Sequence, residues 1–317
     1  MERAATGLDR EGGAKSAPAV SVVIVCMNNR KYLEDCLDSL YGVDIHFTFD
    51  VVLVDNGSTD GTLEMVRARF PQVLMIENGA NVGLSRATNQ GIKATSGRYV
   101  LLLNDDTLVN GPSLDALVGA LESDPKVGAA GGKLLNGDGS LQSGYSRFST
   151  LREEFLIATA LGGVLWEAYP YGNDAEEPLD VDWLGSACLL LRRSALDQTG
   201  LLDEEYFIYG DEADLQYRLR KSGWRVSYVP ACTTIHFGGR SLDRWRRRKM
   251  VYRGKMLFYR KNYGAGKTAV LRFMFAVLSL AKMVVWGTAF LVPAWRTRAK
   301  RELASNADVI KVCWKLA

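Results

Sequence analysis

The feature that most constrains this chain is a series of short, mostly apolar segments, each of which ends in a polar turn. Four of them, residues 20–26, 49–54, 73–77 and 99–103, are rich in Val, Ile and Leu. After the turn, the first three are followed by stretches with helical spacing of apolar residues. Apolar strands that alternate with helices predict a parallel sheet covered on both faces. We therefore expect an α/β fold with a Rossmann-like, mainly parallel sheet flanked by helices.

The composition excludes several classes of protein. The chain has 317 residues, 47% of them hydrophobic, so it can bury a sizeable core. Its formal net charge of +3 gives no indication of nucleic-acid binding. Its 5 cysteines are widely spaced and contain no Cys-x-x-Cys pair, which indicates neither a disulfide framework nor a zinc site. We expect a protein of the reducing cytoplasm.

Polar turns after the predicted strands place candidate ligands at one edge of the sheet. Asn28 follows the first strand, Asp55 the second, and Asp105 and Asp106 the fourth. Ligands of open α/β sheets bind beyond the carboxyl ends of the strands. Two adjacent carboxylates there are hard oxygen ligands through which a divalent cation can bridge to a diphosphate. The alternative is that Asn104, Asp105 and Asp106 only form a turn, since Asx side chains favour turns.

The turn of residues 55–61, Asp-Asn-Gly-Ser-Thr-Asp-Gly, has two interpretations. Its acceptors and backbone N–H groups suit a base edge, a ribose hydroxyl or a phosphate. Alternatively it only caps a helix, with Ser58 or Thr59 as the N-cap. The turns at Asn28 and Asn81 also precede helices on the same edge, which favours ligand binding.

Two further groups offer chemistry in the second half of the chain. Asp211, Glu212 and Asp214 stand at the start of a predicted helix, where acids complement the helix dipole without any other role. Alternatively, like charges and partial burial raise the pKa of one carboxylate, which then serves as a general base toward a sugar hydroxyl. His236 follows a predicted strand and is either a metal ligand or a structural histidine.

Taken together, these residues make the chain resemble family 2 glycosyltransferases of the GT-A fold, particularly the bacterial rhamnosyltransferase-like branch. The resemblance covers about residues 19–263. It rests on Ser21-Val22-Val23-Ile24-Val25 with Asn28, Val54-Asp55-Asn56-Gly57-Ser58-Thr59-Asp60-Gly61, Asn81-Val82-Gly83 with Asn89 and Gly91, Leu103-Asn104-Asp105-Asp106, Asp182-Trp183-Leu184-Gly185-Ser186-Ala187, Asp211-Glu212-Ala213-Asp214-Leu215, and Ile235-His236-Phe237-Gly238-Gly239.

The resemblance implies an inverting direct displacement assisted by a divalent metal, Mn²⁺ or Mg²⁺. The implied nucleotide- and donor-binding residues are Asn28, Asp55, Asn56, Asn81, Asn104, Asp105, Gly185, Ser186 and Ala187. The implied acceptor residues are Trp183 and Asp214, and the implied metal ligands are Asp106 and His236. The implied catalytic base is Glu212.

Two departures from the family pattern change these expectations. The acidic pair is Asp-Glu where many relatives have Glu-Asp, so Asp211 and Glu212 both stay candidates for the base. Asn104 stands at the first position of the expected Asp-x-Asp, which leaves Asp106 with few protein partners around a cation. We therefore expect weak metal affinity in the absence of the donor.

Changes in composition along the sequence also divide the chain into three parts. We expect a disordered leader at 1–17, a GT-A catalytic domain at 18–240 and a helical C-terminal extension at 241–317. Within the catalytic domain we expect a nucleotide-binding half at 18–110 and an acceptor and catalytic half at 111–240. The leader has the composition of a disordered segment and lacks the pattern of a signal peptide.

The C-terminal extension combines a basic run at 244–249 with an apolar stretch at 269–292. That stretch is long enough to cross a bilayer, but Arg272 and Lys282 within it each cost about 3 kcal/mol on insertion scales. We expect a helix or hairpin in the interface of an anionic membrane. A buried helical cap on the enzyme or a homodimer contact is the alternative.

The function expected from these features is sugar transfer at the cytoplasmic face of the cell membrane. The favoured donor is dTDP-L-rhamnose, with UDP-linked hexoses or galactofuranose as alternatives. The acceptor is a hydroxyl of a cell-envelope glycan or polyprenyl-diphosphate-linked saccharide. Residues 241–245 lack the Gln of the Gln-x-x-Arg-Trp motif of processive synthases, so we expect addition of one or a few sugars.

Three other activities compete with sugar transfer. An oxidoreductase is disfavoured because no Gly-x-Gly-x-x-Gly follows the first strand. A nucleotidyltransferase and a non-catalytic module that binds sugar nucleotides are the remaining alternatives.

Overall fold

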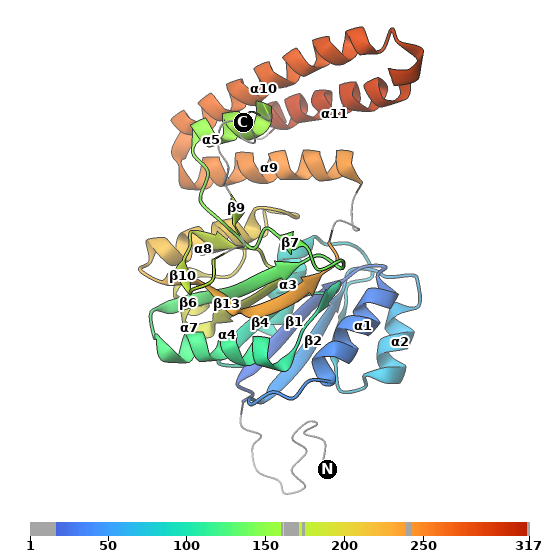
Figure 1. Cartoon of the computed structure of the whole chain (residues 1–317). Coiled ribbons are helices and arrows are strands. Elements are labelled where there is room, and N and C mark those ends of the chain that lie inside the picture. Colours follow the sequence, from blue (N-terminus) through green and yellow to red (C-terminus); the bar gives the residue numbers. More distant parts are fainter. Residues whose placement is uncertain (1–16, 160, 162–170, 173–174, 239–242, 316–317) are drawn as a thin grey trace, which may run out of the picture. The chain divides into compact units, whose positions relative to one another are not determined.

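The computed structural model describes the chain except for residues 1–16, 160, 162–170, 173–174, 239–242 and 316–317 (Figure 1). Almost all of the expected leader therefore lies outside the described residues. The chain divides into two compact units, which we describe separately. The sheet unit comprises Met1–Arg147, Tyr171–Phe207 and Leu215–Gly238, and the helical unit comprises Phe148–Pro170, Ile208–Asp214 and Gly239–Ala317.

The sheet unit is built on one large sheet. Its main strands are β1 (Val20–Cys26), β2 (Phe49–Asp55), β3 (Leu74–Glu77), β4 (Tyr99–Asn104), β6 (Val127–Leu135), β10 (Leu179–Asp180), β12 (Cys188–Arg192) and β13 (Arg225–His236). Their spatial order is β10-β13-β6-β12-β4-β1-β2-β3. Two short strands pair with it, β5 (Thr107–Leu108) beside β13 and β7 (Leu141–Gln142) beside β6. A separate small sheet contains β8 (Tyr145–Ser146), β9 (Tyr171–Gly172) and β11 (Trp183–Leu184).

The large sheet is mainly parallel, as predicted. Strand β1 runs parallel to both β2 and β4, and β2 runs parallel to β3. Within the sheet, β12 lies between β4 and β6 and is antiparallel to both. The short strands β10, β5 and β7 are also antiparallel to their partners. The reversal at β12 joins a parallel first half to a second half in which β13 is again parallel to β6.

Helices cover both faces of this sheet. They are α1 (Arg30–Tyr41), α2 (Thr62–Arg69), α3 (Leu84–Lys93), α4 (Gly111–Ser123), α7 (Arg193–Thr199) and the end of α8 (Asp211–Lys221) from Leu215 onward. Along β1, Val22 and Ile24 join the core under α1, α2 and α4. Val23 points the other way, into the core under α3, α7 and α8. The apolar strand segments are therefore buried on both faces, which places the polar groups at the strand ends.

The sequence also predicts one strand near residues 182–191 and a short strand at 224–230, and both differ from those observed. The first is divided into β11 and β12 by the loop of residues 185–187. The short strand expected at 224–230 continues to His236, because β13 resumes its pairing with β6 after a register shift between Val229 and Thr233. Pro230 lies in this shift, where its missing N–H costs no ladder hydrogen bond.

The helical unit consists of α5 (Leu151–Thr159), α9 (Arg244–Asn262), α10 (Gly264–Ala289), the 3₁₀ turn η1 (Pro293–Trp295) and α11 (Arg296–Lys315), together with the start of α8. Helices α9 and α11 both pack against α10, as does α5. Buried ion pairs hold these helices together. Lys255 Nζ lies 2.6 Å from Glu154 Oε2, and Arg248 Nη1 lies 2.7 Å from Glu302 Oε2.

Candidate functional site

The carboxyl ends of the parallel strands bring three of the predicted turns to one edge of the sheet. In the register of the sheet, Cys26 lies opposite Asp55, and Val25 lies opposite Asn104. The turn that begins at Asn28 therefore lies between the Asp55 turn and the Asn104-Asp105-Asp106 turn. This is the edge at which ligands of open α/β sheets bind.

The Asp55 turn is folded around its own carboxylate. Asp55 is 1% exposed, and its Oδ2 accepts hydrogen bonds from the backbone N–H groups of Gly57 (2.9 Å) and Ser58 (3.0 Å). Its Oδ1 is buried and has no hydrogen-bond partner among the described residues. Burial of an unpaired carboxylate oxygen is costly. An N–H group of a ligand, such as the edge of a nucleobase, would satisfy this oxygen.

Asn28 ties the first turn to the second. Its Oδ1 accepts from the Thr59 N–H at 2.7 Å, and its own N–H donates to Ser58 Oγ at 2.9 Å. Asn28 has φ 52°, a left-handed conformation that Asn tolerates better than most residues. The capping role considered for Ser58 and Thr59 is wrong, because the N-cap of α2 is Gly61 and no side chain caps it. Both hydroxyl residues instead hold the two turns together.

An open hollow of about 420 Å³ adjoins this pair of turns. Its lining residues are Asn28, Asn29, Arg30, Lys31, Tyr32, Glu34 and Asp60. Asp60 accepts from the Arg30 N–H at 3.0 Å, so the start of α1 is fixed to the second turn. The cationic side chains of Arg30 and Lys31 therefore line the hollow beside the nucleotide-binding residues predicted from the sequence.

Asn56 and Asn81 are engaged in the loop that precedes α3. Asn56 Oδ1 accepts from Asn78 Nδ2 at 2.9 Å, and Asn78 pairs with Gln90 through both of its amide atoms. Asn81 Oδ1 accepts from the Gly83 N–H at 2.9 Å, while the Asn81 residue is itself exposed. Asn56 is thus a support of the edge, and Asn81 is accessible to a ligand.

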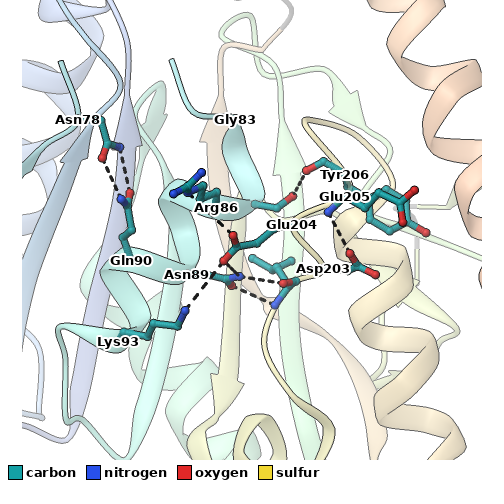
Figure 2. A network of polar contacts seen from close by, with 12 residues as sticks. Asn78, Gly83, Arg86, Asn89, Gln90, Lys93, Asp203, Glu204, Glu205 and Tyr206 are labelled. Carbon is teal, nitrogen blue, oxygen red and sulfur yellow. Dashed lines mark hydrogen bonds and ion pairs between the residues drawn. The ribbon is translucent and has the colours of Figure 1, made fainter. Parts of the chain in front are cut away.

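Helix α3 also anchors the segment of residues 201–207 (Figure 2). The buried Asn89 donates from Nδ2 to the Leu202 carbonyl at 2.8 Å and accepts the Leu202 N–H at 3.1 Å. Ser85 Oγ donates to the Tyr206 carbonyl at 2.7 Å, and the Leu84 N–H donates to the Phe207 carbonyl at 2.7 Å. Along the chain, this anchored segment leads directly to the acidic residues at the start of α8.

Asp106 and His236 come together from the ends of β4 and β13. His236 Nε2 lies 3.3 Å from Asp106 Oδ1 and 3.2 Å from Asn104 Nδ2. Both residues are largely buried, with side-chain exposures of 18% for His236 and 10% for Asp106. The described residues contain no group of three or more His, Cys, Asp or Glu side chains suited to a metal ion. A cation here would therefore have two such protein ligands and take its remaining ligands from water or substrate.

The orientation of His236 is set by Gln142, which sequence reasoning missed. Gln142 Nε2 donates to the His236 carbonyl at 2.7 Å and to Asn136 Oδ1 at 2.7 Å, so Gln142 Oε1 is the remaining acceptor. That oxygen lies 2.8 Å from His236 Nδ1, which must then carry the proton. The lone pair is left on Nε2, the nitrogen beside Asp106. A carboxylate and a neutral imidazole fit a divalent cation, and the second imidazole nitrogen is held in the way that metal-bound histidines usually are.

Asp105 points away from this pair. Its carboxylate is hydrogen-bonded to the Cys26 thiol and to the Asn29 side chain. Burial raises the pKa of Asp105 to about 7, and the nearby Asp106 carboxylate adds to the rise. The two adjacent carboxylates therefore occupy different environments.

The loop of residues 185–187 joins the same edge. The Asn104 N–H donates to the Ala187 carbonyl at 2.9 Å, which fixes the loop beside the Asn104-Asp105-Asp106 turn. Gly185 donates its N–H to the Gly144 carbonyl at 3.1 Å. Among the described residues, apart from the chain neighbours of Gly185, the only heavy atom within 4 Å of a Cβ placed on Gly185 is in the Leu134 side chain, at 3.9 Å. Ser186, between Gly185 and Ala187 in the sequence, is partly exposed.

A buried glutamine holds the strand that precedes this loop. Gln216 Oε1 accepts the Leu184 N–H at 2.8 Å, and Gln216 Nε2 donates to the Leu184 carbonyl at 2.8 Å. The neighbouring Trp183 is partly buried and donates from Nε1 to the Arg147 carbonyl at 3.2 Å. Gln216 was not predicted as a site residue because it carries no motif of its own.

The remaining candidates, Asp211, Glu212 and Asp214, lie in the helical unit. The two residues before them have positive φ, 66° for Tyr209 and 95° for Gly210. Such strain in a non-Gly residue is often associated with a functional site. The Tyr209 backbone is held by close packing, since a Cβ on Gly254 would stand 2.2 Å from the Tyr209 carbonyl oxygen.

Within this acidic group, the environments of the carboxylates differ. Glu212 Oε2 accepts the Gly210 N–H at 3.1 Å, and burial together with the charge of Asp211 raises the pKa of Glu212 well above its usual value. Asp211 is 3% exposed. Asp214 is 2% exposed and accepts from Asn262 Nδ2 at 2.8 Å, so it supports α9. Glu212, which is partly exposed, has the environment that a general base requires.

The sequence matches known proteins over most of this architecture. A model of the family described as "Glycosyl transferase family 2" matches residues 21–200. The chain is 34% identical over 240 residues to the N-acetylglucosaminyl-diphospho-decaprenol L-rhamnosyltransferase of Mycobacterium tuberculosis, covering 70% of this chain and 77% of that protein. It is 27% identical over 236 residues to the O-antigen biosynthesis protein RfbC of Myxococcus xanthus, covering 70% of this chain and 17% of that protein.

Solved structures show the same fold at low sequence identity. The mannosyltransferase PcManGT of Pyrobaculum calidifontis, solved in complex with GDP-Man and Mn²⁺, superposes with a TM-score of 0.56 and 17% identity over 95% of this chain and 88% of that chain. GalNAc-T7, solved with UDP, GalNAc and Mn²⁺, gives a TM-score of 0.55 and 18% identity over 78% of this chain and 50% of that chain. The predicted GT-A fold is thereby confirmed.

Proposed function

We propose that this chain, which belongs to glycosyltransferase family 2, transfers L-rhamnose from dTDP-L-rhamnose to a saccharide linked to a polyprenyl diphosphate. That it is a glycosyltransferase follows from its family. The choice of donor and acceptor rests on the relative whose name specifies L-rhamnose and a diphospho-decaprenol carrier. The observation that carries the proposal is the sheet edge at which the buried Asp55 oxygen and the Asp106 and His236 pair lie on either side of the Asn28 turn.

Asp55 is proposed to bind the base of the donor. Its buried Oδ1 accepts a hydrogen bond, and the N3–H of a thymine or uracil ring is the donor that pyrimidine nucleotides supply. Thymine and uracil both carry this group, which is why a UDP-linked hexose or galactofuranose stays the alternative donor. Asn28 and Asn81 lie on the adjacent turns and are proposed to contact the nucleotide.

The leaving group of the reaction is a nucleoside diphosphate, which departs with negative charge. A divalent metal held by Asp106 and His236, Mn²⁺ or Mg²⁺, would neutralise that charge. Both solved structures above were determined with Mn²⁺. Asn104 and Asp105 are proposed to contact the ribose and diphosphate, and the loop of residues 185–187 to line the sugar.

Glu212 is proposed to act as the general base, with Asp211 as the alternative. The carboxylate removes the proton of the acceptor hydroxyl as that oxygen attacks the anomeric carbon. The new bond forms as the bond to the diphosphate breaks, so the anomeric configuration inverts. The raised pKa of Glu212 brings its basicity closer to that of the group it deprotonates. Trp183 and Asp214 are proposed to contribute to acceptor binding, Asp214 through its hold on Asn262.

The test is a transfer assay with the full chain. dTDP-L-rhamnose, UDP-hexoses and UDP-galactofuranose are each incubated with a short-chain N-acetylglucosaminyl-diphospho-lipid and Mn²⁺ or Mg²⁺. We expect release of dTDP and an acceptor heavier by one deoxyhexose, as measured by mass spectrometry. If product forms only with a UDP-sugar, the donor is that UDP-sugar and not dTDP-L-rhamnose. Release of pyrophosphate from a nucleoside triphosphate, without sugar transfer, would indicate a nucleotidyltransferase and contradict the proposal.

The acceptor proposed here also places the enzyme at a membrane. A polyprenyl-diphosphate carrier is confined to the bilayer, and nucleotide sugars are cytoplasmic, so we propose that the chain works at the cytoplasmic face of the membrane.

A further inference from the structure

Helix α10 carries a large exposed apolar face. Its inner face is mixed, because Leu271, Phe275 and Ala276 are buried together with Thr268 and Ser279, while Arg272 and Lys282 are partly buried. On the opposite face, large apolar side chains follow one another at intervals of three or four residues and are exposed. They are Val270 at 52%, Phe273 at 73%, Val277 at 44%, Leu280 at 54% and Val284 at 70%.

The buried face of α10 is fixed to the rest of the helical unit. Lys282 Nζ donates to the Ala158 carbonyl of α5 at 2.6 Å. The Phe275 ring packs on Tyr252 of α9, with ring centroids 4.5 Å apart. Partial burial lowers the pKa of the Lys282 amine. Lys282 and Thr268 of α10 thus both donate to backbone carbonyls within the helical unit.

These contacts argue against a transmembrane span. Helix α10 has 26 residues and an apolar window long enough to cross a bilayer. A spanning helix would surround Arg272 and Lys282 with lipid at a cost of about 3 kcal/mol each on insertion scales. It would also break the Lys282 to Ala158 hydrogen bond and separate α10 from α9 and α11, against which it packs along its length. Only the outer face is available to lipid.

The charge of the surrounding chain favours a bilayer with anionic headgroups as the occupant of that face. The sequence has no Asp or Glu between Asp243 and Glu302. Exposed cationic side chains stand at both ends of α10, namely Lys267 in its first turn and Arg296, Arg298, Lys300 and Arg301 after it. Each Lys or Arg near an anionic surface contributes about 1 kcal/mol to binding.

Aromatic residues at the C-terminal end of α10 also suit a membrane interface. Trp286 and Trp295 lie with ring centroids 6.2 Å apart, and the Arg298 guanidinium lies 5.3 Å from the Trp286 ring. Trp295 is 50% exposed, as is expected of an aromatic residue at the level of the headgroups. Leu291, at 75% exposure, extends the apolar surface to this end.

We propose that α10 is an in-plane membrane anchor, with the face of Val270, Phe273, Val277, Leu280 and Val284 inserted among the acyl chains and the flanking basic residues on anionic headgroups. The inference deepens the proposed function by assigning the surface that binds the membrane. Its evidence lies within the helical unit and does not depend on the identity of the donor or the acceptor.

The test is flotation of the full chain with lipid vesicles, in the absence of donor and acceptor. The vesicles are made of phosphatidylcholine, with or without phosphatidylglycerol. We expect tight binding to the vesicles that contain phosphatidylglycerol and weaker binding to phosphatidylcholine alone. Replacing Phe273, Val277 and Val284 together with Ser should lower the partition coefficient about 1,000-fold or more, because each side chain contributes about 1.5 kcal/mol or more when fully buried.

Two further sets of variants separate the apolar term from the electrostatic term and from non-specific effects. Replacing Arg296, Lys300 and Arg301 with Gln should lower binding to anionic vesicles about 100-fold, at ~1 kcal/mol per charge, and leave binding to phosphatidylcholine unchanged. The matched control replaces Leu74 and Leu141 of the sheet unit, which are 52% and 55% exposed, with Ser and should not change binding. Circular dichroism and thermal melting establish that each variant is folded.

Three results would overturn the inference. The first is a native chain that does not float with either vesicle, or a Phe273, Val277 and Val284 variant that binds as the native chain does. The second is a native chain that resists extraction from vesicles by alkaline carbonate, which would indicate a span. The third is a dimer by light scattering that the same variant converts to a monomer, with no vesicle binding, which would make a second copy the occupant. The flotation experiments contain neither donor nor acceptor. Their results therefore do not test whether the chain transfers a sugar, which is the proposed function.

Discussion

The sheet unit and the helical unit differ in the side chains that they expose. In the sheet unit, Val22, Ile24 and Val23 are buried beneath helices, and the candidate ligands lie at strand ends. In the helical unit, Arg272 and Lys282 of α10 are only partly buried, while Phe273 is 73% exposed. The first pattern is that of a fold surrounded by water, and the second is that of a fold with an apolar medium on one side. We propose that the two units have different tasks, nucleotide binding in the sheet unit and attachment to a membrane in the helical unit.

The largest expected effect tests whether the helical unit supplies chemistry as well as attachment. Replacing Glu212 with Gln should lower the transfer rate about 10² to 10⁴-fold, because a general base contributes by that amount. Donor affinity, measured by calorimetry, should stay within a factor of two or so, since the proposed nucleotide contacts are elsewhere. Asp211→Asn is the parallel variant. If both variants transfer sugar at the native rate, neither residue is the general base. Attachment to the membrane would then be the one role left to the helical unit in the proposal.

The second effect concerns the metal-binding edge of the sheet unit. Replacing Gln142 with Leu removes the acceptor that holds the proton on His236 Nδ1. We expect the affinity for Mn²⁺, measured by electron paramagnetic resonance in the presence of nucleoside diphosphate, to fall about 10 to 100-fold. Gln198→Leu is a matched control, because Gln198 binds Trp224 at the surface. Unchanged Mn²⁺ affinity in Gln142→Leu would remove Gln142 from the site.

The third effect measures how firmly the sheet unit holds the segment before the acidic residues. Asn89→Ala removes both hydrogen bonds to Leu202 and leaves its buried N–H and carbonyl without these partners. The free energy of unfolding should fall by about 2 to 4 kcal/mol, measured by urea denaturation. Gln90→Ala, on the same helix but paired with Asn78, should cost less. An equal loss in both variants would show that Asn89 has no special part in holding residues 201–207.

The smallest effect is a shift in pH dependence. Burial and the charge of Asp211 raise the pKa of Glu212. A base must be deprotonated, so transfer is lost as the pH falls through that raised pKa. Asp211→Asn removes the like charge, lowers the pKa of Glu212 and should move the acidic limb of the kcat/KM profile to lower pH. A limb that does not move, in a variant that still transfers sugar, would assign the limb to another group.

The same pKa has the opposite consequence for folding. Because the folded state binds this proton more tightly than the unfolded chain does, the carboxyl favours folding at low pH. That contribution is lost as the pH rises through the raised pKa.

Much of the sheet unit could be predicted because its signals are local. The apolar run of β1 and the turn at Asn28 are adjacent in sequence, and so are β4 and Asp106. The direction of β12 could not be predicted, since Leu189, Leu190 and Leu191 have the same pattern in a parallel or an antiparallel strand. Strand direction depends on pairing with residues far away in the chain.

The supports of the site were missed for a similar reason. Gln142 contacts His236 although the two are 94 residues apart in the sequence, and no motif around Gln142 indicates that contact. The sequence showed that Arg272 and Lys282 would be costly in a membrane span. It could not show the Ala158 carbonyl that Lys282 finds 124 residues away. Side chains that act through a distant backbone group leave no pattern in the sequence.

The outward face of α10 has a kinetic consequence. An enzyme held on the bilayer by Phe273 and its neighbours shares a two-dimensional space with any substrate carried by a polyprenyl chain. Its rate of encounter with that substrate then depends on the number of carrier molecules per unit area of membrane, and diluting the carrier with inert lipid slows the reaction even when the total concentrations in the vessel stay the same.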